Sequence, residues 1–289
     1  MFERRKGAPV RLGGRCGKRQ NAPKRCQRGA NEADNQRNGG TEWQAIVAYV
    51  AWEEPEMPDM KRQFRHLDVP YRSQWGDPAL NREIRNGCMD PCDDPAWRNT
   101  GFRDETAYRF WSRRVCGIAC LESILDFLGI AHENRKRMLG EAIDHGVYEI
   151  DGEDSVKGLI YRPFCRWIRS RYRLNARIYE GAPLASVTQE ISPTCMIMAS
   201  VSPEIATPQQ PNHRRGGHLV LIHGADAGHI WFHNPSGIPP FQCDANLAID
   251  HAERFHAGRG MLIDFGEGAN VPLARTRPLQ GPLDRARCA

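Results

Sequence analysis

The sequence lacks the long hydrophobic segments that mark membrane helices and secretion signals. Its first residues, MFERRKGAPVRLGGRCGKRQ, are charged and contain no apolar core. The apolar stretch AIVAYVAW at 45–52 has eight residues, whereas a membrane-spanning helix needs about twenty. The chain also shows no internal repeat and no Walker-type phosphate loop. We therefore expect neither a membrane protein, nor a repeat array, nor a phosphate-loop nucleotide hydrolase.

A regular cysteine framework is also missing. The ten cysteines are irregularly spaced along 289 residues, unlike the dense frameworks of small secreted domains. A chain of this size without a secretion signal is expected to keep its thiols reduced. The sequence thus predicts a cytoplasmic protein.

Positive charge is present but unevenly distributed. Residues 1–40 contain eight arginines and three lysines against three acidic residues, a net charge of about +8. Since the whole chain carries +5, the remainder carries about −3, which does not indicate a nucleic-acid-binding surface. A basic, glycine-rich leader is typical of a solvated, disordered arm. Binding of RNA or another anion by this arm is the alternative interpretation.

Proline and glycine divide the chain into three parts. The segment EEPEMPDM at 53–60 is interpreted as a linker, because its prolines interrupt helices and strands. We expect a basic arm and linker at 1–60, a compact domain at 61–265 and a flexible tail at 266–289. The tail is predicted from its prolines and its few large apolar residues.

Within the domain, predicted helices come first and predicted strands follow. The residues of 116–129 place Leu121, Ile124, Leu125 and Leu128 on one helical face, with Gly129 as the stop. A second helix is predicted at 156–172, with Phe164, Trp167 and Ile168 inward. Segments rich in β-branched and aromatic residues predict strands at 176–180, 194–201, 218–224, 229–235 and 260–265. This order predicts an α+β fold with an antiparallel sheet.

Cys116 stands at the start of the first of these helices. Backbone N–H groups at a helix N-terminus favour a thiolate and lower the pKa of a cysteine there. A buried free cysteine is also common at such a position, which alone does not identify a nucleophile. A nucleophilic cysteine also needs a base and a group that orients the base, so the histidines decide between the two interpretations.

His218 is the best candidate base among the ten histidines. The short link ADAG at 225–228 predicts a hairpin of the strands on either side. A hairpin centred near Asp226 would place His218 opposite Asn234, with Cβ atoms roughly 5 Å apart. His223 is an odd number of residues away and should point to the opposite face, near His229.

Three blocks of this sequence resemble the C39-like peptidases of the papain-like superfamily. They are VPYRSQW (69–75), CGIACLESIL (116–125) and GGHLVLIHGADAGHIWFHNPSG (216–237), in that order. The similarity extends over about residues 67–265. It implies a papain-like cysteine protease fold and a peptidase that acts on a peptide or protein substrate without a cofactor.

The resemblance also implies a role for each of four residues. Cys116 would be the nucleophile and His218 the general base and acid. Asn234 would orient the imidazole, and Gln74 would donate to the oxyanion together with the backbone N–H of Cys116. The chemistry agrees, because an amide can hold a neutral imidazole and can direct an N–H at developing negative charge.

The chain departs from the family pattern at three points. Asn234 stands where many C39 members have aspartate. Gln74 precedes Cys116 by 42 residues, so that 75–113 must loop out or cover the cleft. The membrane transporter that accompanies the best-known members has no counterpart here, and their double-glycine leader substrates are not inherited.

Other interpretations of the cysteines and of the fold stay open. Cys88 and Cys92, in CMDPC, have a spacing that a structural zinc site permits, although we assign no metal. Cys116 and Cys120 have the same spacing, but Cys120 lies beside the apolar face and is better explained as a buried small residue. The fold could also serve as a catalytically silent binding domain, or as an acyltransferase that uses the same thioester.

Overall fold

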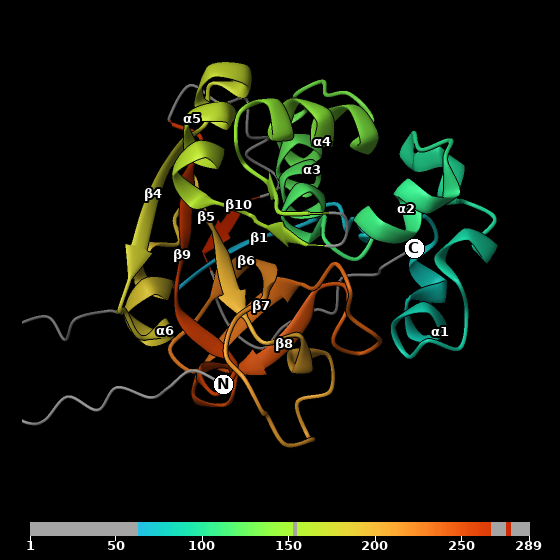
Figure 1. Ribbon diagram of the computed structural model, residues 1–289. Coiled ribbons are helices and arrows are strands. Elements are labelled where there is room, and N and C mark those ends of the chain that lie inside the picture. Colours follow the sequence, from blue (N-terminus) through green and yellow to red (C-terminus); the bar gives the residue numbers. More distant parts are fainter. Residues whose placement is uncertain (1–62, 153–154, 267–275, 279–289) are drawn as a thin grey trace, which may run out of the picture. The chain divides into compact units, whose positions relative to one another are not determined.

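The chain folds into an antiparallel sheet with helices packed against it, as Figure 1 shows. This computed structural model describes residues 63–152, 155–266 and 276–278. The α+β class predicted from the order of elements is confirmed. The predicted arm and linker at 1–60 lies outside the described residues.

The helices and strands have the following bounds. The α-helices are α1 (Asn81–Arg85), α2 (Glu105–Trp111), α3 (Cys116–Leu128), α4 (Arg135–Asp144), α5 (Tyr161–Tyr172), α6 (Leu184–Val187) and α7 (Ile249–Glu253). The strands are β1 (Phe64–His66), β2 (Glu149–Ile150), β3 (Val156–Lys157), β4 (Asn175–Glu180), β5 (Cys195–Val201), β6 (His218–Ala225), β7 (His229–His233), β8 (Ala245–Ala248), β9 (His256–Asp264) and β10 (Thr276–Pro278).

The main sheet is organised around β6. Its strand order is β10-β1-β6-β5-β9-β4, and β7 pairs with β6 on one side and with β8 on the other. All of these pairs are antiparallel. Helix α3 packs against β6 and α5 packs against β4. Helix α3, which begins at Cys116, is therefore held against β6.

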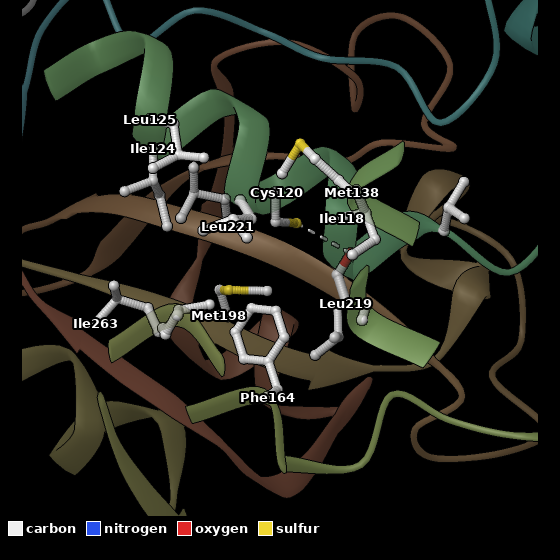
Figure 2. Packing of buried hydrophobic residues seen from close by; sticks show 14 of the residues in the cluster. Ile118, Cys120, Ile124, Leu125, Met138, Phe164, Met198, Leu219, Leu221 and Ile263 are labelled. Atoms are coloured by element: carbon white, nitrogen blue, oxygen red, sulfur yellow. Dashed lines mark hydrogen bonds between the residues drawn. The ribbon is translucent and has the colours of Figure 1, made fainter. Parts of the chain in front are cut away.

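Helix α3 forms as its apolar face predicts. Leu121, Ile124, Leu125 and Leu128 are all buried, and Gly129 ends the helix in the left-handed conformation with φ 66°. Figure 2 shows side chains of α3 packed against residues of β5, β6, β9 and α5. Burial on both sides of the helix fixes its position relative to the sheet.

Helix α5 is shorter than predicted. The sequence predicted a helix over 156–172, but Val156–Lys157 form β3, which pairs with β2, and the helix starts at Tyr161. Pro163 falls in its first turn, where a missing N–H is tolerated, so the proline marked the start. Phe164, Trp167 and Ile168 are buried as predicted.

The predicted flexible tail does not hold at 276–278. These residues form β10, which pairs with β1 through His66↔Thr276, Arg65↔Arg277 and Phe64↔Pro278. Strand β1 would otherwise leave one row of backbone groups unpaired. Proline is tolerated in an edge strand such as β10, so the prolines of this segment did not exclude a strand.

The predicted register of the β6–β7 hairpin is wrong by two residues. Leu221 pairs with His233 and Ile222 with Phe232. If this register is extended along the two segments, His218 lies opposite Ser236 and not opposite Asn234. The cause is the turn, which centres beyond Asp226, because the Asp226 side chain accepts hydrogen bonds from the backbone of Gly228 and His229. A bulge between Ile222 and Gly224 then reverses one residue of the register shift that the turn introduces.

Candidate active site

Cys116 begins α3 and His218 begins β6, and these two elements pack against each other. Both residues line a cavity of about 800 Å³. Cys116 is the first residue of α3 and is half-buried, and α3 packs closely against β6 at Leu219, next to His218. Gly117 permits this approach, because a Cβ there would lie 2.5 Å from the Leu159 side chain and 3.0 Å from that of Leu219.

The imidazole of His218 is oriented by the turn that follows β7. Its Nε2 lies 2.8 Å from Oδ1 of Asn234. The Ser236 backbone N–H also donates to that Oδ1, at 3.3 Å, which identifies the atom as an oxygen. Nε2 of a neutral His218 must therefore carry the proton, and Nδ1 keeps its lone pair. The Asn234 contact expected from the sequence is thus present despite the different register.

The resting pair is electrically neutral near pH 7. Burial raises the pKa of the Cys116 thiol, and hydrogen bonds with backbone groups lower it by less. Burial lowers the pKa of His218 to about 4, against the opposing effect of the Asn234 hydrogen bond. The expectation that the helix start would favour a thiolate is therefore wrong, because desolvation of the charged form outweighs it.

Asn234 is held by a tight turn. Its N–H donates to the Gln242 carbonyl at 2.8 Å, and its own carbonyl accepts from the Gly237 N–H at 2.8 Å and from the Tyr71 hydroxyl at 2.9 Å. A Cβ at Gly237 would lie 2.2 Å from the Phe241 carbonyl oxygen. Glycine is needed there because the turn packs directly on backbone.

Gln74 lies beside this turn but does not line the cavity. Its backbone N–H donates to the Pro235 carbonyl at 2.9 Å, and the residue is buried. The side chain is not among those that form the cavity wall. The structure thus brings Cys116, His218 and Asn234 together and places Gln74 near Asn234 through the backbone.

The insertion between Gln74 and Cys116 folds beside the site. Residues 75–113 contain α1 and α2, and of this segment only Arg113 contributes to the cavity wall. The Asn81 side chain of α1 donates to the Gly237 carbonyl at 2.9 Å. The insertion therefore supports the Asn234 turn.

Sequence reasoning missed two residues that influence His218. Ser236 Oγ lies 3.3 Å from His218 Nε2, and Arg85 Nη1 donates to the same hydroxyl at 3.2 Å. The positive charge of Arg85 adds to the lowering of the His218 pKa. Ser236 could have been found, because it belongs to the NPSG block that follows β7, whereas Arg85 carries no sequence signal.

The remaining cysteines differ in environment. Cys120 is buried in the core with its thiol 3.7 Å from the Leu219 carbonyl (Figure 2), as a small core residue would be. Cys88 is exposed, and Cys92 is half-buried with a pKa raised by burial to about 11. No group of three or more potential ligands is placed to hold a metal within the described residues. Cys243 is disulfide-bonded, so the expected reduced state does not hold there.

His223 belongs to a separate cluster. It lies in the bulge of β6, its ring 4.6 Å from that of His233, and its Nε2 is 3.5 Å from Asp244. Asp244 is paired with Arg65, and His223 Nδ1 contacts the His66 carbonyl. None of these residues lines the cavity of Cys116 and His218.

Comparison of the sequence with protein-family models and with curated proteins found no match to either. The described part of the chain contains no helix with the length and apolar character needed to cross a membrane.

Proposed function

We propose that this protein is a cysteine hydrolase with a papain-like fold, similar to the C39-like peptidases, that cleaves a peptide or related amide bond in the cytoplasm. The observation that carries the proposal is the shared cavity of Cys116 and His218, with His218 Nε2 held by Asn234. This arrangement leaves Nδ1 without a partner in the described residues and supports its use as a base.

The proposed reaction begins from the neutral pair. His218 Nδ1 takes the thiol proton as Cys116 Sγ attacks the substrate carbonyl carbon. The tetrahedral oxyanion is stabilised by the Cys116 backbone N–H and by the Gln74 side chain. The C–N bond breaks, the amine leaves with the proton from His218, and a thioester remains. Water then attacks the thioester with His218 as base, which releases the acid and restores the thiol.

The side chain of Gln74 does not line the cavity in this structure. Its backbone is anchored beside Asn234, and no hydrogen bond holds its side chain in the described residues. The proposal therefore assigns oxyanion stabilisation first to the backbone N–H of Cys116, with Gln74 contributing once substrate is bound.

One observation favours a catalytically silent binding domain. Cys116 and His218 make no hydrogen bond with each other in the described residues. An acyltransferase would share the same thioester and differ only in the attack by an amine in place of water. A silent binding domain predicts no cleavage product, and an acyltransferase predicts a joined product in place of the free acid.

The proposal is tested by incubating a proteome-derived peptide library with the full chain and mapping new termini by mass spectrometry. Wild type and Cys88→Ser, which alters an exposed thiol, should generate the same new termini, and Cys116→Ser none. Termini that persist with folded Cys116→Ser would contradict the proposal. Joined peptides would indicate acyl transfer. Peptides that are retained by the protein without being cleaved would indicate a binding domain.

A further inference from the structure

The cavity of the proposed active site is strongly basic. Among its charged wall residues are five arginines, Arg113, Arg114, Arg162, Arg166 and Arg259, against a single acidic residue, Glu180. Glu180 lies opposite Arg259 across the β4–β9 pair, so its charge is offset locally. His218 adds no positive charge at neutral pH, since burial keeps it neutral. A bound substrate therefore meets an excess of positive charge.

The basic character continues along α5 beyond the cavity. Arg162, Arg166 and Arg169 are spaced four and three residues apart, which places them along one side of α5. Arg173 follows as the residue that ends the helix, in the left-handed conformation. All four are exposed. We call this set the α5 arginine row. Two of its members line the cavity, and Arg166 also lines a second depression together with Arg169 and Arg173.

The arginine row has no acidic partners within the described residues. None of its four guanidinium groups makes a salt bridge there, whereas Arg171 of the same helix pairs with Glu141 at 3.2 Å. Like charges at this helical spacing repel one another and destabilise the helix. An unpaired row that runs from a proposed active site is explained if a ligand supplies the negative charge.

We propose that the α5 arginine row binds an acidic segment of the polypeptide substrate, next to the bond presented to Cys116. That the ligand is a polypeptide substrate rests on the proposed function. The binding surface itself is inferred from its positive charge and from its continuity with the cavity. A nucleic acid would also be attracted, but single strands are bound by stacking of bases on exposed aromatic rings. The described residues include one exposed large hydrophobic side chain, Ile150, which is not aromatic.

The test measures binding separately from cleavage. Fluorescence anisotropy is recorded for a glutamate-rich peptide and for the same peptide with glutamine at each glutamate position, on full-length Cys116→Ser. The test variant is Arg166→Gln/Arg169→Gln. The matched control is Arg171→Gln/Arg177→Gln, which removes the same charge from arginines already paired with Glu141 and Glu190.

We expect the glutamate peptide to bind about tenfold more tightly than the glutamine peptide, and the row variant to lose about tenfold in affinity. Added salt should weaken this binding, and the control should change little. Equal binding of both peptides, equal loss in both double variants, or tighter binding of a single-stranded RNA of equal charge would each overturn the inference. If wild type binds the glutamate peptide while the peptide library yields no new termini, the acidic-ligand surface stands and the hydrolase proposal fails.

Discussion

At the scale of single residues, burial controls the protonation state of the proposed nucleophile. Because burial raises the pKa of Cys116, its reactive thiolate is a minor form at neutral pH. We predict that alkylation of Cys116 by iodoacetamide, followed by peptide mapping, is slow at pH 7 and keeps accelerating above pH 9. A rate that is already constant at neutral pH would mean a preformed thiolate–imidazolium pair and would contradict this.

The amide of Asn234 sets the protonation of His218 at the same scale. In Asn234→Asp, a carboxylate next to Nε2 favours the imidazolium, so the pKa of His218 should rise from about 4 by one unit or more. An NMR titration of the ring protons measures this directly, and any acid limb of turnover should move to higher pH with it. Asn234→Ala serves as the control, since it removes the hydrogen bond without adding charge. An unchanged titration in the aspartate variant would mean that Asn234 does not orient His218.

At the scale of elements, the turn after β7 positions the side-chain amide of Asn234. In Gly237→Ala the added Cβ meets the backbone of residues 241 and 242, so the turn must shift and carry Asn234 with it. We expect turnover to fall by about tenfold or more and the melting temperature to drop. Gly228→Ala is the control, because the Cβ there contacts nothing closer than 4.0 Å. If both variants behave alike, close packing of this turn is not what positions Asn234.

The elements also show what the sequence could predict. Helix α3 was predictable because its buried face and its glycine stop are local signals. The hairpin register was not, because the Asp226 turn and the bulge at His223 depend on side-chain hydrogen bonds that the apolar pattern does not encode. Because side chains alternate between the two faces of a strand, a shift of two residues kept His218 on the expected face. The turn that contains Asn234 then brings its side chain to His218. Strand β10 was missed because its partner β1 lies at the other end of the domain.

The candidate site was predictable in its residues and not in its electrostatics. Cys116, His218 and Asn234 each stand in a recognisable sequence motif. The neutral resting pair depends on desolvation by surrounding segments, together with the charge of Arg85. Such an environment exists only after the chain has folded. The arginines of the row can be read from the sequence. Their position beside Cys116 is known only from the structure, in which Arg162 and Arg166 line the same cavity.

At the scale of the whole molecule, buried histidines couple stability to pH. Burial lowers the pKa of His66, His218 and His233 to about 4, and that of His223 well below its ordinary value. The unfolded chain binds protons at these residues below about pH 6.5, and the folded chain does not. Stability is therefore retained above pH 6.5 and lost as the pH falls towards 4, by up to about 1.4 kcal/mol per pH unit for each histidine.

Urea unfolding at pH 7 and at pH 5 measures this loss. The midpoint should fall clearly at pH 5, and the fall should be smaller in His66→Gln, which removes one of the buried groups. A midpoint that is the same at both pH values would contradict neutral burial of these histidines.

Covalent labelling tests, without a known substrate, whether Cys116 and His218 act as one site. A glutamate-rich peptide that ends in a vinyl sulfone is added to the full chain, and the labelled residue and the rate are read by mass spectrometry. We predict one label, on Cys116, and a rate that falls by about 10²–10⁴ in His218→Ala but not in His223→Ala, with both variants shown to be folded by thermal melts. Labelling of Cys116 at the wild-type rate in folded His218→Ala would contradict the account.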